Sequence, residues 1–307
     1  MDSAIKYCRR NEIDIAKWDH CIDTASNGLI YGYSFYLDTM ARHWDGLVLN
    51  DYEAVMPLTW NRKLGVSYLY QPFATAQLGL FGLNFDEELL RRFFESVPKE
   101  FRYWDIYLNR ANLFPVPGFP LYQRTNYVLD LSRPYEELKS EYRENIRRNC
   151  RRSEQLGCKP VTDVDLEQVL SLAWQQIRSH TRVARENRDR FRKLFEILKS
   201  RGGAITYGML SAASDLLASC VFFFSHGRAY YILVGNHPNG RTSGASHALI
   251  DAFIKDHAGR SLLLDFEGSD IRNLAFFYSS FGAREEKYPA LRLNRLPGWL
   301  RWLKPSG

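Results

Sequence analysis

The second half of the chain carries the clearest pattern of apolar and polar positions. Residues 204–210 and 216–225 are apolar runs separated by the turn-like segment 211–215, which predicts a β-hairpin. Residues 228–234 are rich in Tyr, Ile and Val and predict a third strand, followed by a turn cluster at 235–240. These three strands are expected to form one meander.

Beyond residue 240 the spacing of apolar residues becomes that of a helix, with apolar positions at Leu249, Ala252, Phe253 and Ala258. Ser243 or Ser246 is expected to cap its start, and Gly259 is expected to end it. The elements predicted after this helix are a short buried strand at 261–266, a helix at 272–281 closed by Gly282, and a last strand at 290–293.

The rest of the chain predicts a similar order of elements. Three helices precede the meander, at 135–156, 165–180 and 188–201. The first half predicts paired strands within 47–60, a strand at 67–71, a helix at 87–97, and strands at 103–108 and 122–130. The sequence therefore predicts an α/β protein of two tandem domains, residues 1–132 and 133–307, each a mixed sheet flanked by helices.

Composition supports a folded protein and narrows its location. Hydrophobic residues make up 45% of the 307, and 41 basic against 35 acidic residues leave a net charge of 41 − 35 = +6, which favours anionic partners without requiring them. Five cysteines without a CxxC pair predict neither disulfides nor a zinc site. The N-terminus lacks the apolar core of a signal peptide, and the longest apolar run, 216–224, is too short to span a membrane. We expect a cytoplasmic protein.

The sequence lacks the motifs of several enzyme classes. The sequence contains no GxxxxGK[ST], HExxH or GxSxG, and its seven histidines show no metal-ligand spacing. We therefore expect no metal, no tightly bound cofactor and no DNA partner.

The strongest candidate site is the segment 265–283. A strand that ends near Asp265 and is followed by a capped helix places polar groups at the carboxyl edge of a sheet, where α/β folds commonly bind ligands. The residues Asn273, Ala275, Tyr278, Phe281 and Gly282 resemble the late motif of the GNAT acetyltransferase superfamily, with the final Gly-Phe reversed. Residues 264–268 are also similar to FemAB-type peptidyltransferases, which have tandem GNAT-like folds and use aminoacyl-tRNA.

This resemblance implies a role for Tyr278, and the chemistry of two nearby carboxylates suggests roles for them as well. Tyr278 would be the general acid that protonates the departing thiolate of coenzyme A, whereas simple packing on its helix is the alternative. Asp265 and Glu267 would align a substrate amine or accept its proton, and solvated carboxylates after a strand are the alternative.

A second segment, 240–246, precedes the predicted helix. It resembles the acetyltransferase loop that binds the pyrophosphate of coenzyme A through backbone amides, although Ser occupies the second small position. The implied cofactor-binding residues are Arg241, Gly244, Ala245, Ser246 and Asn273. A helix-capping loop explains the same residues equally well.

A third segment, 143–152, concentrates five arginines in about three turns of the predicted helix, with Arg143, Arg147 and Arg151 on one face. It is similar to a basic helix of FemAB-type enzymes, and this implies that Arg143 and Arg147 hold a phosphate of a nucleotide-linked substrate or of tRNA. The alternative is a solvated face paired with nearby glutamates.

A fourth segment, 68–79, ends a predicted strand with aromatic and amide side chains. It resembles the substrate-binding segment of the first domain of FemAB-like proteins, which implies that Tyr70, Gln71 and Gln77 line a substrate cleft. An ordinary transition from strand to loop is the alternative.

Taken together, these residues predict transfer of an acyl or aminoacyl group, from acyl-coenzyme A or aminoacyl-tRNA as co-substrate, to an amine on a small molecule or peptide. Two alternatives stay open. One is a degenerate transferase that only binds a ligand, and the other is an RNA-binding protein that uses the arginines of 143–152.

Overall fold

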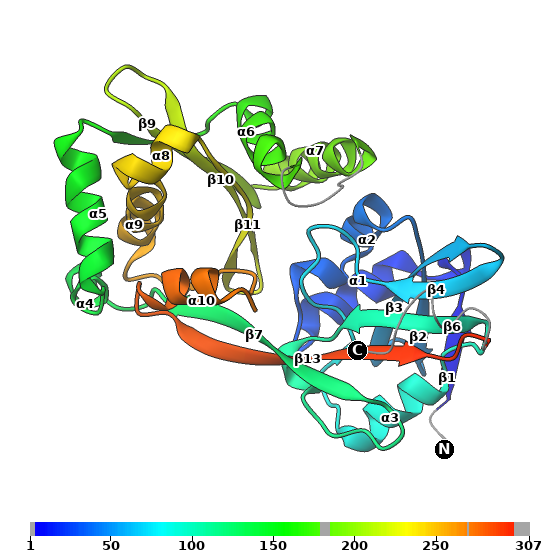
Figure 1. Cartoon of the computed structure of the whole chain (residues 1–307). Coiled ribbons are helices and arrows are strands. Elements are labelled where there is room, and N and C mark those ends of the chain that lie inside the picture. Colours follow the sequence, from blue (N-terminus) through cyan, green and yellow to red (C-terminus); the bar gives the residue numbers. More distant parts are fainter. Residues whose placement is uncertain (1–3, 179–184, 269, 298–307) are drawn as a thin grey trace. The chain divides into compact units, whose positions relative to one another are not determined.

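The computed structural model describes residues 4–178, 185–268 and 270–297. The chain divides into two compact units, Met1–Thr125 with Lys287–Gly307 (unit 1) and Asn126–Glu286 (unit 2). It passes from one unit to the other within two strands, β7 (Leu121–Asp130) and β13 (Arg284–Asn294) (Figure 1). The division into tandem domains 1–132 and 133–307 stays a prediction, and it differs from these units because residues 287–297 belong to the same unit as the N-terminal part.

Unit 1 is a mixed sheet covered by helices. Its strands are β1 (Ile5–Cys8), β2 (His43–Leu49), β3 (Ala54–Lys63), β4 (Val66–Tyr70), β6 (Phe101–Tyr107) and the end of β13, in that spatial order, with the short β5 (Phe81–Gly82) beside β3. Strands β4 and β6 are parallel and the other pairs are antiparallel. Its helices are α1 (Ile15–Thr24), α2 (Ser34–Met40) and α3 (Glu87–Glu95). Strand β1 and helices α1 and α2 were not predicted.

Unit 2 contains the remaining strands, which also run in mixed directions. Its spatial order is β7, β12 (Leu263–Asp265), β11 (Arg228–Asn236), β10 (Leu216–Ser225), β9 (Ala204–Leu210) and β8 (Lys159–Thr162). Strands β11 and β12 are parallel, and the other pairs are antiparallel. The predicted meander is confirmed, with observed bounds for β9 and β10 that equal the predicted ones.

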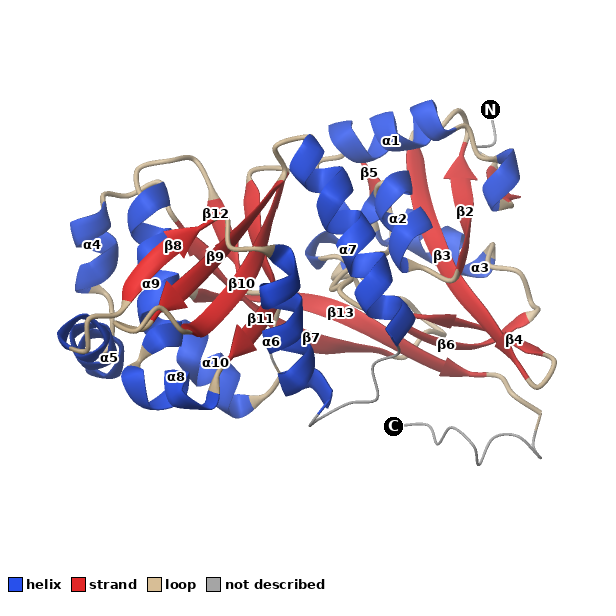
Figure 2. Cartoon of the chain, turned by 90° about the horizontal axis from the view of Figure 1, so that it is seen from above, coloured by secondary structure: helices blue, strands red, loops and turns tan. Residues whose placement is uncertain are grey.

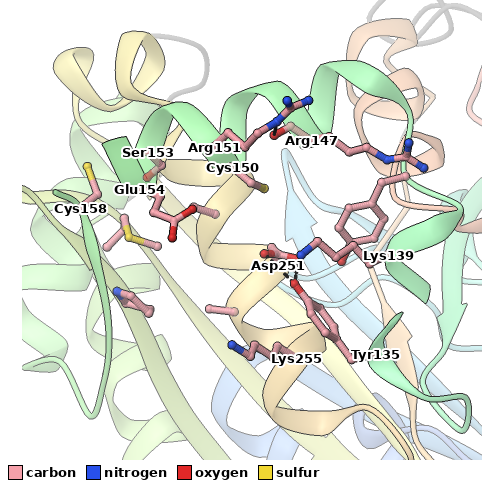
Figure 3. A pocket seen from close by; sticks show the side chains of 15 residues that line it. Tyr135, Lys139, Arg147, Cys150, Arg151, Ser153, Glu154, Cys158, Asp251 and Lys255 are labelled. Atoms are coloured by element: carbon pink, nitrogen blue, oxygen red, sulfur yellow. Dashed lines mark hydrogen bonds between the residues drawn. The ribbon is translucent and has the colours of Figure 1, made fainter. Parts of the chain in front are cut away.

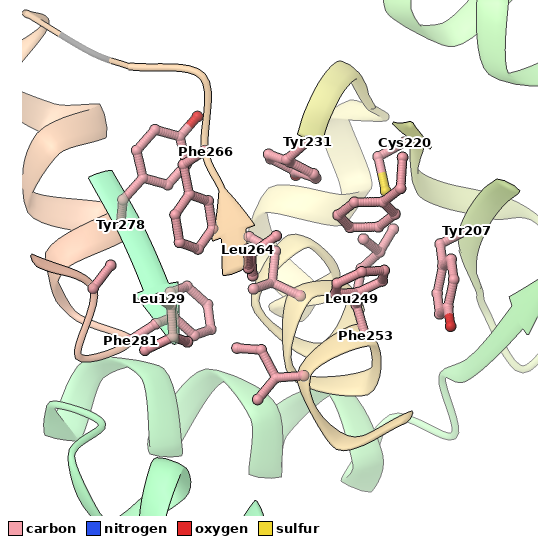
Figure 4. Close-up of a cluster of buried hydrophobic side chains, with 14 of the residues drawn as sticks. Leu129, Tyr207, Cys220, Tyr231, Leu249, Phe253, Leu264, Phe266, Tyr278 and Phe281 are labelled. Atoms are coloured by element: carbon pink, nitrogen blue, oxygen red, sulfur yellow. The ribbon is translucent and has the colours of Figure 1, made fainter. Parts of the chain in front are cut away.

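Helices cover both faces of the sheet formed by the strands of unit 2. On one face lie α6 (Leu166–Arg178) and α7 (Arg185–Ser200), and on the other lie α9 (Ala245–His257) and α10 (Arg272–Ser279), with α5 (Glu144–Gln155) packed on α9 (Figures 1 and 2). The core between α9, α10 and the sheet is rich in aromatic rings, and Figure 4 shows part of it. Phe222 and Phe253 stack there with ring centroids 3.6 Å apart.

Three local predictions were wrong. The predicted helix 135–156 is two helices, α4 (Tyr135–Ser140) and α5, because the backbone at Arg143 is extended (φ −67°, ψ 157°). The predicted turn around 235–240 includes the start of a short helix, α8 (Pro238–Ser243). No serine caps α9, since Gly244 (φ +75°) stands between α8 and α9. The Ser246 hydroxyl instead donates a hydrogen bond to Asn236 Oδ1. Residues 179 and 180 of the predicted helix 165–180 lie outside the described residues.

Within the described ranges, no helix combines the length and the apolar character that crossing a membrane requires.

Candidate active site

The candidate site lies where strands β11 and β12 stop pairing. The two strands run parallel, and their last paired residues are Tyr230 and Asp265. Strand β11 continues to Asn236, paired on its other side with β10. Residues 231–236 therefore present one edge that β12 does not fill, at the carboxyl end of both strands, which is the position where α/β sheets commonly bind ligands.

Asp265 is held in a buried ionic network at this end of β12. Its Oδ2 lies 2.7 Å from Arg228 Nη1, and its Oδ1 accepts hydrogen bonds from Asn126 Nδ2 and from the backbone N–H of Glu267, both at 2.9 Å. Arg228 also donates to both carboxylate oxygens of Glu286, at 3.0 and 2.7 Å. Asp265 is 2% exposed, and its carboxylate joins the end of β12 to β11 and β7, while Arg228 adds Glu286 of β13 to the network.

Glu267 differs from Asp265 although only one residue separates them. Its backbone has a positive φ of +64°, which is uncommon for a residue with a side chain. Its Oε1 is buried without a hydrogen-bond partner, and burial raises the pKa of this carboxyl well above the ordinary value for glutamate. A carboxyl group with a raised pKa and no partner is suited to accept a proton.

Tyr278 lies beside Glu267. Its ring is buried, stacked on Phe266 with centroids 4.6 Å apart, and its hydroxyl points away from the apolar cluster (Figure 4). The hydroxyl has no hydrogen bond to a described residue. Burial and then the charge of Glu267 raise the pKa of this phenol, so it keeps its proton at neutral pH.

The predicted cofactor-binding residues fall into two places. Gly244, Ala245 and Ser246 lie together at the start of α9, where a Cβ on Gly244 would come within 2.3 Å of the Asn149 carbonyl oxygen of α5. Helix α5 therefore covers this turn closely. Arg241 belongs to α8, although its side chain is outside the described set. Asn273 lies exposed on α10.

The arginines of 143–152 are also divided. Arg143 precedes α5, and its guanidinium lies 5.1 Å from the ring centroid of Phe276 on α10. Arg147 donates to the Ser140 carbonyl at 2.5 Å and, with Arg151, lines a pocket between α5 and α9. The structure therefore brings Arg147 to a pocket and Arg143 to α10.

The side chains of the three predicted substrate residues of unit 1 accept hydrogen bonds from backbone N–H groups. Tyr70 Oη accepts from the Arg42 N–H at 2.8 Å. Gln71 Oε1 accepts from the Tyr107 N–H at 3.0 Å, and Gln77 Oε1 accepts from the Arg110 N–H, also at 3.0 Å. These contacts fix the loop that follows β4, and a substrate role for the three residues stays a prediction.

Sequence reasoning missed Arg228 and three residues of the α5–α9 pocket, Lys139, Asp251 and Lys255. The available signals were an arginine that opens an otherwise apolar strand and an aspartate between the apolar residues Ile250 and Phe253. A polar residue at an apolar position needs a buried partner or a ligand.

Comparison with known proteins places this geometry in a known fold. Residues 140–270 match a family model described as an acetyltransferase (GNAT) domain. A comparison with curated protein sequences gave no significant match.

Three solved structures resemble the whole chain. The structure of FemX aligns with a TM-score of 0.67 and 12% identity, covering 98% of this chain and 100% of that one. A conserved protein of unknown function from Bacteroides thetaiotaomicron aligns with a TM-score of 0.61 and 14% identity, covering 94% and 100%. The C-terminal domain of a putative lysylphosphatidylglycerol synthetase from Agrobacterium fabrum aligns with a TM-score of 0.53 and 12% identity, covering 92% of each chain. The chain therefore has a FemAB-like GNAT fold, and residues 140–270 are the part that matches the GNAT family model.

Proposed function

We propose that this protein transfers an activated acyl or aminoacyl group to an amine at the place where β11 and β12 separate. The observation that carries the proposal is the buried Glu267 Oε1, which has no partner among the described residues, beside the Tyr278 hydroxyl, which makes no hydrogen bond to a described residue. Both residues follow β12, whose pairing with β11 ends at Asp265, and the Tyr278 ring centroid lies 6.5 Å from that of Tyr231, the first residue of β11 beyond this pairing. The GNAT domain match over residues 140–270 supports the same reaction class.

The proposed chemistry needs only positioning and proton transfer. Glu267 in its ionised form takes a proton from the acceptor amine, and the amine nitrogen forms a C–N bond with the acyl carbon of the donor. The C–S bond of a thioester or the C–O bond of an ester then breaks. Tyr278 gives its proton to the departing sulfur or oxygen, and the proton held by Glu267 restores the phenol. Asp265 acts on this step only by fixing the end of β12.

Of the two candidate donors, we favour aminoacyl-tRNA over acyl-coenzyme A. The backbone of α5 lies against Gly244, at the turn that resembles the pyrophosphate loop of acetyltransferases. The same helix carries exposed arginines, including Arg148 and Arg152, which suit a polyanion.

The five free cysteines support a cytoplasmic location, since a reducing compartment keeps thiols unpaired.

A second candidate function is RNA binding without catalysis. Arg148 and Arg152 make no ion pair with another described residue, and this favours an anionic partner on that face. Steeply salt-dependent tRNA binding that is lost in the double variant Arg148→Ala/Arg152→Ala, together with no transfer from any donor, would support this second function.

The test of the first function is a transfer assay. The full chain is incubated with acyl-coenzyme A or aminoacyl-tRNA and a panel of peptide amines and amino sugars, and new amides are detected by mass spectrometry. Tyr278→Phe keeps the ring and removes the hydroxyl, so we expect kcat to fall roughly 100-fold with little change in KM.

Tyr207→Phe is the matched control, because Tyr207 is a buried tyrosine of the same unit whose hydroxyl donates to Asp256 at 2.9 Å. Its kcat should equal that of the wild type. Equal rates for the Tyr278 variant and the control would remove Tyr278 from the reaction.

A further inference from the structure

The pocket between α5 and α9 lies in unit 2, on the side of α9 that faces away from the sheet. It has a volume of about 580 Å³ and is bounded by α4, α5 and α9, with Pro160 of β8 and Met209 of β9 at one side. This volume is in the range of small-molecule sites. Its lining includes neither Glu267 nor Tyr278, so it is separate from the proposed active site.

Cationic side chains from three helices surround this pocket. Lys139 comes from α4, Arg147 and Arg151 come from α5, and Lys255 comes from α9 (Figure 3). The carboxylates in the lining are Asp251 and Glu154, and Arg151 is paired with Glu144 outside the lining at 2.9 Å, so the other three cations leave a formal charge of 3 − 2 = +1. The pocket therefore has the electrostatic character of an anion site.

The two lysines are not neutralised by ion pairs. Lys139 and Lys255 lie over the ring of Tyr135, with Nζ 5.2 and 5.9 Å from its centroid, and neither makes a hydrogen bond or an ion pair with a described residue. Asp251 lies nearby, but both of its carboxylate oxygens accept from the Tyr135 hydroxyl, at 3.0 and 3.1 Å. Six N–H donors of the two ammonium groups are thus left for a ligand.

One buried hydroxyl in the same lining has no hydrogen-bond partner among the described residues. Ser153 is 1% exposed, and its Oγ is buried without such a partner. The Tyr142 hydroxyl, 3% exposed, faces the Asp251 carboxylate, which is an acceptor for it. Buried hydroxyls are nearly always satisfied, so Ser153 Oγ indicates a missing partner in this pocket.

We propose that the pocket between α5 and α9 binds the phosphate group of a small phosphate ester. The side-chain groups open to a ligand there are donors, on the two lysines and the Ser153 hydroxyl, and a phosphate offers several acceptor oxygens with the negative charge that the pocket lacks. The pocket is much larger than a phosphate ion. Apolar atoms of Met209, Ala248 and Ala252 are placed to contact the organic part of the ester.

The experiment measures the melting temperature of the full chain with three probes at equal ionic strength: sodium chloride, inorganic phosphate and phenyl phosphate. We expect phosphate to raise the melting temperature above the chloride value, and phenyl phosphate to raise it further because its ring contacts the apolar lining. Equal melting temperatures with all three probes would overturn the proposal.

Substitutions locate the anion. Lys139→Gln and Lys255→Gln should each weaken phenyl phosphate binding about tenfold by titration calorimetry, because each removes a charge-assisted hydrogen bond. Lys193→Gln, an exposed lysine on α7, is the matched control and should bind like the wild type. Unchanged binding in both pocket variants would mean that the anion binds elsewhere, which contradicts the proposal.

Ser153→Ala distinguishes binding from folding. It removes an unsatisfied buried hydroxyl, so the ligand-free melting temperature should stay equal or rise, while the increase caused by phenyl phosphate should become smaller. A lower ligand-free melting temperature with an unchanged increase would assign Ser153 a structural role. Binding of tRNA without binding of phenyl phosphate would also refute a small-molecule site.

Discussion

The loop after β4 in unit 1 and the segment after β12 in unit 2 are both rich in polar side chains, but they use them differently. In unit 1 the amide oxygens of Gln71 and Gln77 accept hydrogen bonds from backbone N–H groups. In unit 2 the Glu267 Oε1 is buried without a partner, and the Tyr278 hydroxyl makes no hydrogen bond to a described residue.

The difference separates structural from chemical use of polar groups. A side chain whose hydrogen-bonding capacity is filled by its own fold stabilises that fold and has little left for a substrate. A buried polar group without a hydrogen-bond partner lowers the stability of the fold and stays available for chemistry. Asp265 and Glu267 show the same contrast within one segment.

The largest expected effect is that of Glu267→Gln on the proposed transfer. Removing a general base should lower kcat by roughly 100- to 10,000-fold. In the wild type, kcat should rise with pH as the carboxyl ionises, because burial raises the pKa of Glu267 and only the ionised form accepts a proton. Rate measurements from pH 5 to pH 9 check both expectations.

The same variant should be more stable than the wild type at neutral pH. A carboxyl whose pKa is raised by folding contributes stability below its unfolded pKa, and this contribution is lost as the pH rises through the folded value. Glutamine stays neutral and avoids this loss. Glu196→Gln, at an exposed position of α7, is the control. A wild-type stability that does not fall with pH relative to Glu267→Gln would contradict the buried state of this carboxyl.

Next in size is the effect of Arg228→Met on stability. The substitution leaves Asp265 and Glu286 without their cation in a buried position, and we expect a loss of about 3–5 kcal/mol in the free energy of unfolding. Urea unfolding measures it, with Arg284→Met at an exposed position of β13 as the control. A loss no larger than that of the control would mean that the network does not hold the strand ends.

The smallest expected effect is that of Gln77→Leu in unit 1. Gln77 is 3% exposed, and the substitution removes the acceptor of the Arg110 N–H, so we expect a loss of roughly 1–3 kcal/mol in stability. Kinetic constants for transfer should not change. A raised KM for the acceptor amine with normal stability would instead support the substrate role that the sequence predicts for this residue.

Much of the unit 2 fold could be predicted from the sequence, because its elements are marked locally. The apolar runs of β9 and β10 end at turn residues, and α9 has a helical period. The break between α4 and α5 was not predictable from charge or period, since it depends on the backbone of Arg143 donating to the Ser280 carbonyl, a contact between segments distant in sequence.

The site was predictable only in part, for a similar reason. Glu267 and Tyr278 were identified through a motif within one segment. The side-chain partners of Asp265 come from two other strands, so no local sequence pattern indicates that its carboxylate binds Arg228 and Asn126. Likewise, no local pattern shows that Lys139 and Lys255, on different helices, lie over one tyrosine ring.

The division of unit 1 into two sequence segments has a consequence for synthesis. Its strand β13 pairs with β6, through Ala290 and Tyr107 among others, but the ribosome makes β13 only after all of unit 2. Unit 2 is one continuous segment whose ends are joined by a hydrogen bond between Tyr127 and Glu285. During translation, the β6 edge of the earlier segment therefore waits for its last strand until unit 2 has been made.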